Sequence, residues 1–268
     1  MEIDTGTSEL LCRLEERVAV VTLNKPKKKN ALGDILTPAL RKILLTLEAD
    51  ERVGCVMITG AENAFCAGGD VSEMGSGPVK APRSDKEVVA ELIEKQETLT
   101  LRIHELEKIT VAALPGVAAG AGLSIALACD LRVACESAFV TTAFKNVGLS
   151  GDYGASWFLP RLVGLAQAKE LFYTADRVPA NRCLELGIFN RVFPDETFHS
   201  DAFAFARGLA NGPSMAYARM KQHLNASQQQ SLRETLAMEA EHMIASMRSG
   251  EAREAISAFV EKRPPRFH

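Results

Sequence analysis

The stretches AFCAGGD (Ala64–Asp70) and GVAAGAG (Gly116–Gly122) decide the fold of this chain. The first comes shortly after a strand predicted over Val53–Ile58, and the second directly follows a strand predicted over Thr110–Leu114. Small residues after a strand leave backbone N–H groups uncovered, so that these groups can point at a ligand. Either loop taken alone is equally compatible with a tight turn or a close helix contact that binds nothing.

Strands and helices are predicted to alternate on both sides of these loops. β-Branched and apolar runs predict strands over 18–23, 53–58, 110–114 and 131–135, and helical spacing predicts helices over 35–47, 89–106 and 123–129. This alternation favours an α/β fold with mostly buried strands. From about Ala155 onward the pattern is nearly all helical. We therefore expect an α/β core over residues 1–195 and a helical C-terminal region over 196–268. Gly75–Asp85 is rich in Gly, Pro and Ser, which predicts a mobile loop.

Composition excludes several classes of function. The chain has 268 residues, 47% hydrophobic and 24% charged, which is ordinary for one large soluble domain. The net charge of -3 and the lack of a basic stripe argue against nucleic acid as a partner. No stretch approaches the roughly 18 apolar residues of a membrane span. The polar start, Met1–Glu9, does not read as a signal peptide, so a cytoplasmic location is expected.

Cysteine and histidine spacing gives no sign of a metal or redox centre. The six cysteines are scattered without a C-x-x-C pair, which predicts reduced thiols, most of them buried. None of the five histidines lies in an H-E-x-x-H motif or beside a nucleophile motif. We therefore expect no metal site and no histidine base.

The second loop precedes a predicted helix, and a helix N-terminus favours negative charge. Neither loop is a G-x-G-x-x-G or a Walker A sequence, so a nucleotide-phosphate site is not indicated.

The two loops together, at this spacing, resemble the enoyl-CoA hydratase/isomerase (crotonase) family. The resemblance covers nearly the whole chain, because several family motifs occur in the same order: Leu23–Pro26, Asn30–Leu32, Ala64–Asp70, Gly116–Asp130, Phe158–Gly164 and Ile256–Arg263. It implies a crotonase-type fold, a spiral of ββα units with a helical C-terminal region that forms homotrimers or hexamers.

The resemblance also implies a site for an acyl-coenzyme A thioester. The N–H groups of Gly69 and Ala121 are expected to form an oxyanion hole, which stabilises the enolate that forms next to a thioester carbonyl. Lys29 is expected near the CoA phosphates. Further contacts to the bound thioester are expected from four small or acidic residues: Ala31, Ala67, Asp70 and Gly122. No separate cofactor is expected, because coenzyme A is part of the substrate.

The family shares this hole but not one reaction, so the acids and bases decide the function. Hydratases of the family use two glutamates, and the matching positions here are Ser124 and Phe144. Neither residue can activate water and protonate carbon unaided, so ordinary hydration is disfavoured.

Asp152 is the acidic residue that matches a catalytic position of the family. From the sequence alone it could be the N-cap of a helix that begins near Ala155. Family members with aspartate here use it as the base of double-bond isomerases or as the nucleophile of a dehalogenase. The dehalogenase also uses a histidine, which is expected within Gly75–Leu99, and this stretch contains none.

The stretch Gly151–Leu162 most resembles a family branch that isomerises enoyl chains and a ring epoxide in bacterial phenylacetate breakdown. The sequence thus predicts an acyl-CoA isomerase with Asp152 as its proton carrier, and apolar neighbours would raise the basicity of this carboxylate. Phe144, Trp157 and Phe158 are candidates for such neighbours, as acyl-pocket walls or as plain core. Two alternatives stay open. One is a hydratase-like enzyme that uses Glu91 or Glu94, and the other is a catalytically silent acyl-CoA-binding protein.

Overall fold

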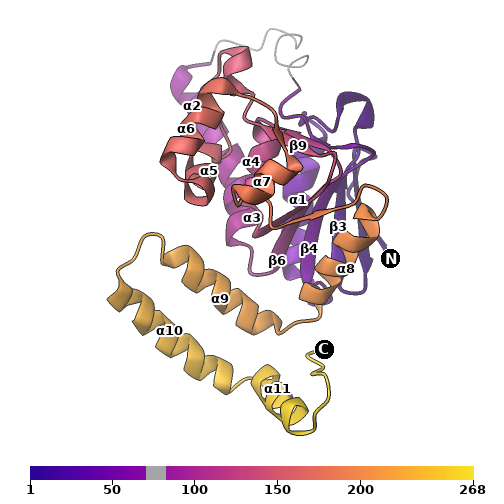
Figure 1. Ribbon diagram of the computed structural model, residues 1–268, viewed down its shortest axis with the longest axis vertical. Helices are drawn as coiled ribbons and strands as arrows, with labels where there is room; N and C mark the ends of the chain where they lie inside the picture. The colour runs from indigo at the N-terminus through magenta and orange to yellow at the C-terminus, as the bar shows by residue number, and fades with distance from the viewer. Residues whose placement is uncertain (71–82) are drawn as a thin grey trace.

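The structure is a computed structural model that describes residues 1–70 and 83–268. Most of the loop predicted over 75–85, residues 75–82, lies outside the described residues. The described residues form one body of strands and helices from which the last three helices extend (Figure 1).

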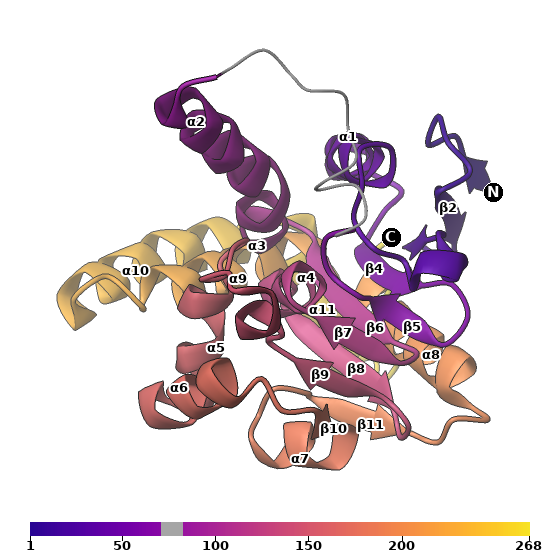
Figure 2. The ribbon, with the colours of Figure 1, turned by 90° about the horizontal axis from the view of Figure 1, so that it is seen from above.

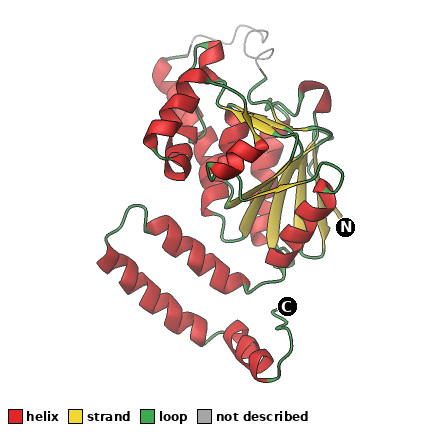
Figure 3. Cartoon of the chain, viewed as in Figure 1, coloured by secondary structure: helices red, strands yellow, loops and turns green. Residues whose placement is uncertain are grey.

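The strands form two sheets (Figure 3). The larger sheet has the order β1-β2-β3-β4-β6-β8-β11, and the smaller has the order β10-β9-β7-β5. The bounds are β1 (Glu2–Ile3), β2 (Leu10–Glu15), β3 (Val18–Leu23), β4 (Cys55–Gly60), β5 (Ala64–Cys66), β6 (Ile109–Leu114), β7 (Val117–Ala119), β8 (Leu131–Cys135), β9 (Phe139–Thr141), β10 (Val178–Pro179) and β11 (Arg191–Phe193).

The helices cover the sheets and form the C-terminal region. Their bounds are η1 (Pro26–Lys28), α1 (Leu36–Ala49), α2 (Asp85–Gln96), η2 (Glu97–Leu101), α3 (Arg102–Glu105), α4 (Ala121–Ala128), η3 (Phe144–Val147), α5 (Ala155–Val163), α6 (Leu165–Thr174), α7 (Ala180–Glu185), α8 (Phe198–Ala210), α9 (Ser214–Ala226), α10 (Leu232–Met247) and α11 (Gly250–Val260). The α/β architecture with a helical C-terminal region is confirmed.

The central strands β3, β4, β6 and β8 are parallel to one another and almost wholly buried. Buried parallel strands need helices on both faces. Helix α8 covers one face, against β3, β4, β6 and β8, while the smaller sheet lies on the other side (Figure 2). The division of the chain at residue 195 stays a prediction, and α8 packs on the core although it follows that point.

The smaller sheet positions the two small-residue loops, Ala64–Asp70 and Gly116–Gly122. Strands β5 and β7 are parallel neighbours, with Ala64 beside Val117 and Cys66 beside Ala118. Their carboxyl ends therefore leave the sheet on the same side, and the residues after Cys66 emerge next to those after Ala119. The sequence predicted both three-residue strands as loop, because Ala and Cys carry no β-strand preference and the pairing is long-range.

The region predicted as one helix over 89–106 is a continuous helical segment with an irregular middle. Helix α2 begins after Ser84, whose hydroxyl accepts from the Glu87 N–H while the Glu87 carboxylate binds the Ser84 N–H. Residues Glu97–Leu101 then form a π-helical turn before α3 continues. Such turns insert an extra residue into a helix and often lie at functional sites.

All six cysteines are buried and unpaired. Burial raises the pKa of Cys66 to about 12 and raises that of Cys12 to about 11, so these thiols stay protonated and unreactive. No helix among the described residues has the length and apolar character to cross a membrane. Within residues 1–70 and 83–268, no three His, Cys, Asp or Glu side chains gather as a metal site would need.

Helices α9, α10 and α11 form what we call the C-terminal arm (Figure 1). The arm is fixed to the core through α9, where the Lys221 ammonium contacts Asp130 Oδ2 at 2.9 Å and the Lys108 carbonyl at 3.4 Å. Beyond this anchor, the arm exposes large apolar side chains, among them Leu232, Met243, Met247, Phe259 and Val260.

Candidate active site

A cavity of about 470 Å³ opens where the two loops emerge from the smaller sheet. Both predicted oxyanion residues, Gly69 and Ala121, line it, and so does Asp152. Helices α1 and α2 contribute further walls through Thr37, Arg41, Leu92 and Lys95, and the segment from Ala143 to Tyr153 contributes others. The structure thus brings three residues far apart in sequence into one cavity.

In the first loop, an isolated parallel β-bridge between Gly69 and Leu32 orients the Gly69 N–H. The Leu32 N–H donates to the Gly68 carbonyl at 2.7 Å, and the Asp70 N–H donates to the Leu32 carbonyl at 2.9 Å. Gly69 lies between these two partners, and in a parallel bridge the N–H of the residue in between points away from the opposite segment. The Gly69 N–H accordingly donates to no acceptor among the described residues and is available to a ligand.

The second loop presents the Ala121 N–H at the start of α4. The first N–H groups of a helix have no acceptor within it, and Ala121 has none among the described residues either. Gly120 before it has φ 51° and ψ −126°, a conformation that suits glycine. A Cβ on Gly68 would lie 3.6 Å from the Ala121 nitrogen, so the two loops are in close contact.

The residues predicted to contact coenzyme A divide into two groups. Ala67 and Asp70 line the cavity, whereas Lys29, Ala31 and Gly122 do not. Asp70 is buried and forms ion pairs with Lys25 at 3.2 Å and Lys28 at 3.7 Å. Close packing requires glycine at position 122, because a Cβ there would lie 2.3 Å from the Cys66 carbonyl oxygen. Lys29 is exposed, and its carbonyl accepts from the Ala67 N–H at 3.0 Å.

Asp152 lies half-buried in the wall of the cavity, in the loop before α5. It is not the N-cap of that helix, because the cap is Gly154 and no side chain caps it. The Oδ1 atom is fully buried and has no hydrogen-bond partner in the described residues. Loss of hydration raises the pKa of this carboxyl above its ordinary value. A buried, unpaired carboxylate is a stronger base than an exposed one.

Comparison with known proteins decides the family of a chain with this fold and cavity. Residues 13–268 match the profile of the enoyl-CoA hydratase/isomerase family. The chain belongs to this family. It is 34% identical over 258 residues to the 1,2-epoxyphenylacetyl-CoA isomerase of Escherichia coli (strain K12), covering 96% of this chain and 97% of the relative.

Other relatives show how varied the chemistry of the enoyl-CoA hydratase/isomerase family is. A 4-chlorobenzoyl coenzyme A dehalogenase of an Arthrobacter species is 32% identical, covering 91% of this chain and 88% of the relative. The crystal structure of an enoyl-CoA hydratase from Polaromonas sp. JS666 superposes with a TM-score of 0.89 at 34% identity, covering 97% of this chain and 99% of that one. These relatives share the family and the crotonase-type fold with this chain but not one reaction. The residues of the site therefore decide which reaction the chain supports.

Ser124 and Phe144, which the family resemblance matches to the glutamates of hydratases, make other contacts here. Ser124 is fully buried in α4, and its hydroxyl lies 3.0 Å from the Asp152 carbonyl and 3.3 Å from the Gly120 carbonyl. Phe144 lines the cavity and stacks on Phe172, with ring centroids 6.0 Å apart. Both are parts of the structure around Asp152, and neither is an acid or a base.

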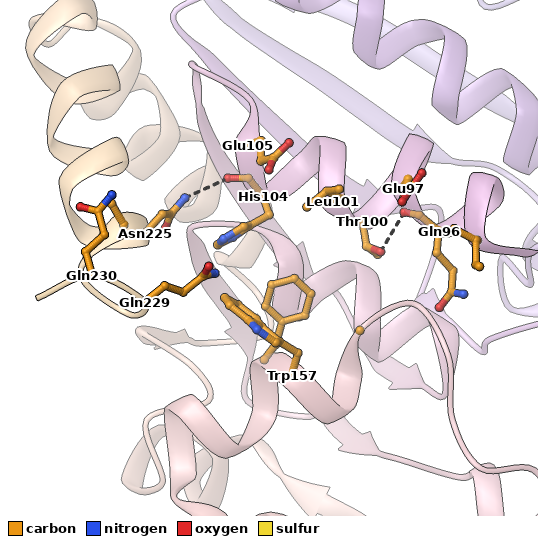
Figure 4. A pocket seen from close by; sticks show the side chains of 14 residues that line it. Gln96, Glu97, Thr100, Leu101, His104, Glu105, Trp157, Asn225, Gln229 and Gln230 are labelled. Atoms are coloured by element: carbon orange, nitrogen blue, oxygen red, sulfur yellow. Dashed lines mark hydrogen bonds between the residues drawn. The ribbon is translucent and has the colours of Figure 1, made fainter.

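Trp157 and Phe158 do not border this cavity. They line a second one of about 600 Å³ between η2, α5 and the arm, with His104 packed edge-on against both rings (Figure 4). Of the three aromatic residues singled out from the sequence, Phe144 is the one next to the catalytic candidate.

Glu91 and Glu94, the acids considered for a hydratase-like reaction, do not line the cavity. Glu91 forms ion pairs with Arg83 and Lys95, and these cations lower the pKa of its carboxyl to about 2. A carboxylate held in that way is a poor proton carrier.

Sequence reasoning missed three residues that surround Asp152. Gln96 Oε1 accepts from the Tyr153 N–H at 2.7 Å, and the Arg41 guanidinium contacts the Tyr153 hydroxyl at 3.3 Å. These contacts join positions 57 and 112 residues apart. Helical periodicity placed Arg41 and Gln96 on helices but carries no signal for partners so distant in sequence.

Proposed function

We propose that this protein is an acyl-CoA isomerase that shifts a double bond in an enoyl-CoA thioester, with Asp152 as its single acid–base group. The observation that carries the proposal is the unpaired, buried Oδ1 of Asp152 in the same cavity as Gly69 and Ala121. The likeness to an isomerase of ring-epoxide CoA thioesters supports a ring-bearing acyl group as a further substrate.

The reaction needs only the groups that line the cavity. Starting from a β,γ-unsaturated thioester, the Asp152 carboxylate removes a proton from the α-carbon. The C–H electrons move towards the thioester oxygen, and the N–H groups of Gly69 and Ala121 stabilise the resulting dienolate. Protonated Asp152 then delivers the proton to the γ-carbon, and the double bond ends between the α- and β-carbons. No cofactor enters this scheme beyond the coenzyme A of the substrate.

Hydration is the second candidate, because relatives of this chain include a short-chain-enoyl-CoA hydratase. That reaction requires groups that activate water and protonate carbon. Ser124 and Phe144 supply neither, so we expect crotonyl-CoA hydration far below ordinary enzyme turnover, which is on the order of 10 s⁻¹. Turnover near that value would favour the hydratase.

We also propose that the protein acts in the cytoplasm as a homotrimer or a dimer of trimers. The exposed apolar side chains of the arm, such as Leu232 and Phe259, support this assembly because large apolar patches mark interaction surfaces. Light scattering of the purified protein measures its mass directly.

The decisive experiment replaces Asp152 by asparagine, which is nearly isosteric but cannot carry the proton. General acid–base groups contribute about 10²–10⁴ in rate, so kcat for β,γ-enoyl-CoA isomerisation should fall by that order. The Gly69 and Ala121 donors are untouched, so coenzyme A thioester affinity should persist. Ultraviolet absorbance follows conjugation, and calorimetry follows binding.

Asp176→Asn is a matched control, because Asp176 is exposed and lies outside the cavity. If Asp152→Asn still isomerises a β,γ-enoyl-CoA at the wild-type rate, the base lies elsewhere. If the wild-type protein binds acyl-CoA but converts nothing, it is a silent binder and the isomerase proposal fails.

A further inference from the structure

The peptide group between Asp152 and Tyr153 is held at both of its polar atoms. Its carbonyl oxygen accepts from the Ser124 hydroxyl at 3.0 Å, and its N–H donates to Gln96 Oε1 at 2.7 Å. The C=O and N–H of a trans peptide point in opposite directions, so the two side chains grip the peptide plane from opposite sides. We call this arrangement, Ser124 and Gln96 on the Asp152–Tyr153 peptide, the peptide clamp.

We infer that Ser124 and Gln96 are positioning residues that fix the direction of the Asp152 carboxylate. The torsions on either side of the clamped peptide are ψ of Asp152 and φ of Tyr153. A peptide plane that cannot rotate fixes the backbone at the Asp152 Cα, from which the carboxylate projects. The inference rests on the proposed function, since it matters only where Asp152 moves the proton.

The backbone at the clamp would not hold this shape by itself. Tyr153 has φ 51°, the left-handed region that a bulky residue seldom adopts. Non-glycine residues in this region persist when surrounding contacts impose it. The Gln96 amide and the Arg41 contact to the Tyr153 hydroxyl at 3.3 Å supply such contacts. Loss of one of them should let the peptide relax and the carboxylate turn away.

The clamp also fixes the position of Asp152 relative to the oxyanion hole. Ser124 lies one helical turn after Ala121 in α4, the helix whose first N–H is the second oxyanion donor. Because Ser124 bonds directly to the Asp152 carbonyl, one rigid helix holds both the donor and the loop that carries the base. The serine that stands in place of a hydratase glutamate thus keeps a role in this cavity.

Gln96 joins the clamp to the wall of the acyl cavity. It is the last residue of α2, which also supplies Leu92 and Lys95 to that wall. The π-helical turn follows at once, and the Gln96 carbonyl accepts from the Thr100 hydroxyl at 3.2 Å (Figure 4). The irregular turn anchors Gln96 at the boundary between the two cavities.

The test compares Ser124→Ala, Gln96→Leu and the double variant in the full-length protein. A displacement of about 1 Å can lower a rate by about 100-fold, so each single variant should lose about 10–100-fold in kcat while KM changes less than about threefold. Gln96→Glu keeps the acceptor oxygen and should recover most of the Gln96→Leu loss. Because both side chains hold one peptide, the double variant should be little slower than the slower single variant.

A second readout separates positioning from loss of packing. A rigidly held carboxylate returns the proton it removed, whereas a loosened one exchanges it with solvent first. We expect Ser124→Ala and Gln96→Leu to transfer less α-deuterium to the γ-carbon than the wild type does. Hydrogen–deuterium exchange of residues 151–155 should rise in both variants whether or not they are active. Gln167→Leu is the matched control, since the Gln167 amide bonds to Glu170 on the same helix, α6, away from the cavity.

Wild-type kcat and label transfer in both single variants would overturn the clamp, as would losses that multiply in the double variant. Failure of the proposed function looks different. In that case Asp152→Asn itself retains activity, whereas failure of the clamp alone leaves Asp152→Asn inactive and the Gln96 and Ser124 variants fully active.

Discussion

Asp152, the proposed acid–base group, carries an energetic cost for the folded protein. Burial raises the pKa of this carboxyl, so the folded state binds its proton more tightly than the unfolded chain does. The resulting stabilisation is fully present below the unfolded pKa and is lost as the pH rises through the folded pKa. Wherever this carboxyl is ionised, the folded protein holds a charged group whose Oδ1 atom is buried and has no hydrogen-bond partner among the described residues.

We expect Asp152→Asn to raise the melting temperature at neutral pH, because asparagine has no charge to desolvate. The difference from the wild type should shrink as the pH falls through the raised folded pKa of Asp152 and should be gone below the ordinary range of an aspartate, where both side chains are neutral. Differential scanning calorimetry across this range measures it.

A variant that melts lower than the wild type at neutral pH would show that the carboxylate has a stabilising partner. Asp176→Asn, at an exposed site, serves as the reference for a change of net charge alone.

Helix α4 begins with Ala121, whose N–H is the second proposed oxyanion donor. Proline fits the first position of a helix and removes only an N–H that the helix does not use. Ala121→Pro should therefore keep the fold and remove one oxyanion donor. The loss of one such donor typically lowers kcat by about 10²–10³, which steady-state isomerase kinetics would measure.

Leu232→Pro makes the same change at the first residue of α10, outside the cavity, and should leave kcat at the wild-type level. Unchanged turnover in folded Ala121→Pro would remove Ala121 from the site.

Elements with strong local signals were predictable from the sequence, and those made by long-range pairing were not. Strands β3 and β8 have the predicted bounds, because each is a largely apolar run with clear ends. Strands β5 and β7 have three residues each and are defined by long-range pairing, β5 with β7 and β7 with β9. The second sheet was therefore invisible in the sequence, although it positions both loops.

The candidate site was predictable to the same extent. Gly69, Ala121 and Asp152 follow from family resemblance, and the structure gathers them in one cavity. The clamp was not predictable, because its hydrogen bonds reach a backbone peptide from positions 28 and 57 residues away in sequence. A backbone acceptor or donor has no residue type that a sequence pattern could signal.

At the scale of the whole molecule, a buried ion pair joins the core to the arm. Asp130 Oδ2 accepts from the Thr110 N–H and hydroxyl and from the Lys221 ammonium. The Lys221 and Asp130 side chains are only 6% and 19% exposed. Removing one partner of such a pair leaves the other charge poorly hydrated, so the contact holds the arm at a defined place.

Lys221→Met should lower the free energy of unfolding by about 3 kcal/mol and loosen the arm. Thermal unfolding measures the first effect. Limited proteolysis measures the second, as faster cleavage near residue 213, between α8 and α9. Lys169→Met, at an exposed position of α6, is the control. Equal melting and cleavage in both variants would show that the arm is held by its other contacts.

The use of one carboxylate, that of Asp152, for both proposed proton transfers has a stereochemical consequence. A carboxylate that projects from one clamped peptide approaches the flat dienolate from one side. The proton that leaves the α-carbon and the proton that arrives at the γ-carbon must therefore share a face, which makes the isomerisation suprafacial. We therefore expect the protein to remove only one of the two prochiral hydrogens on the α-carbon, and the orientation of the Asp152–Tyr153 peptide determines which one.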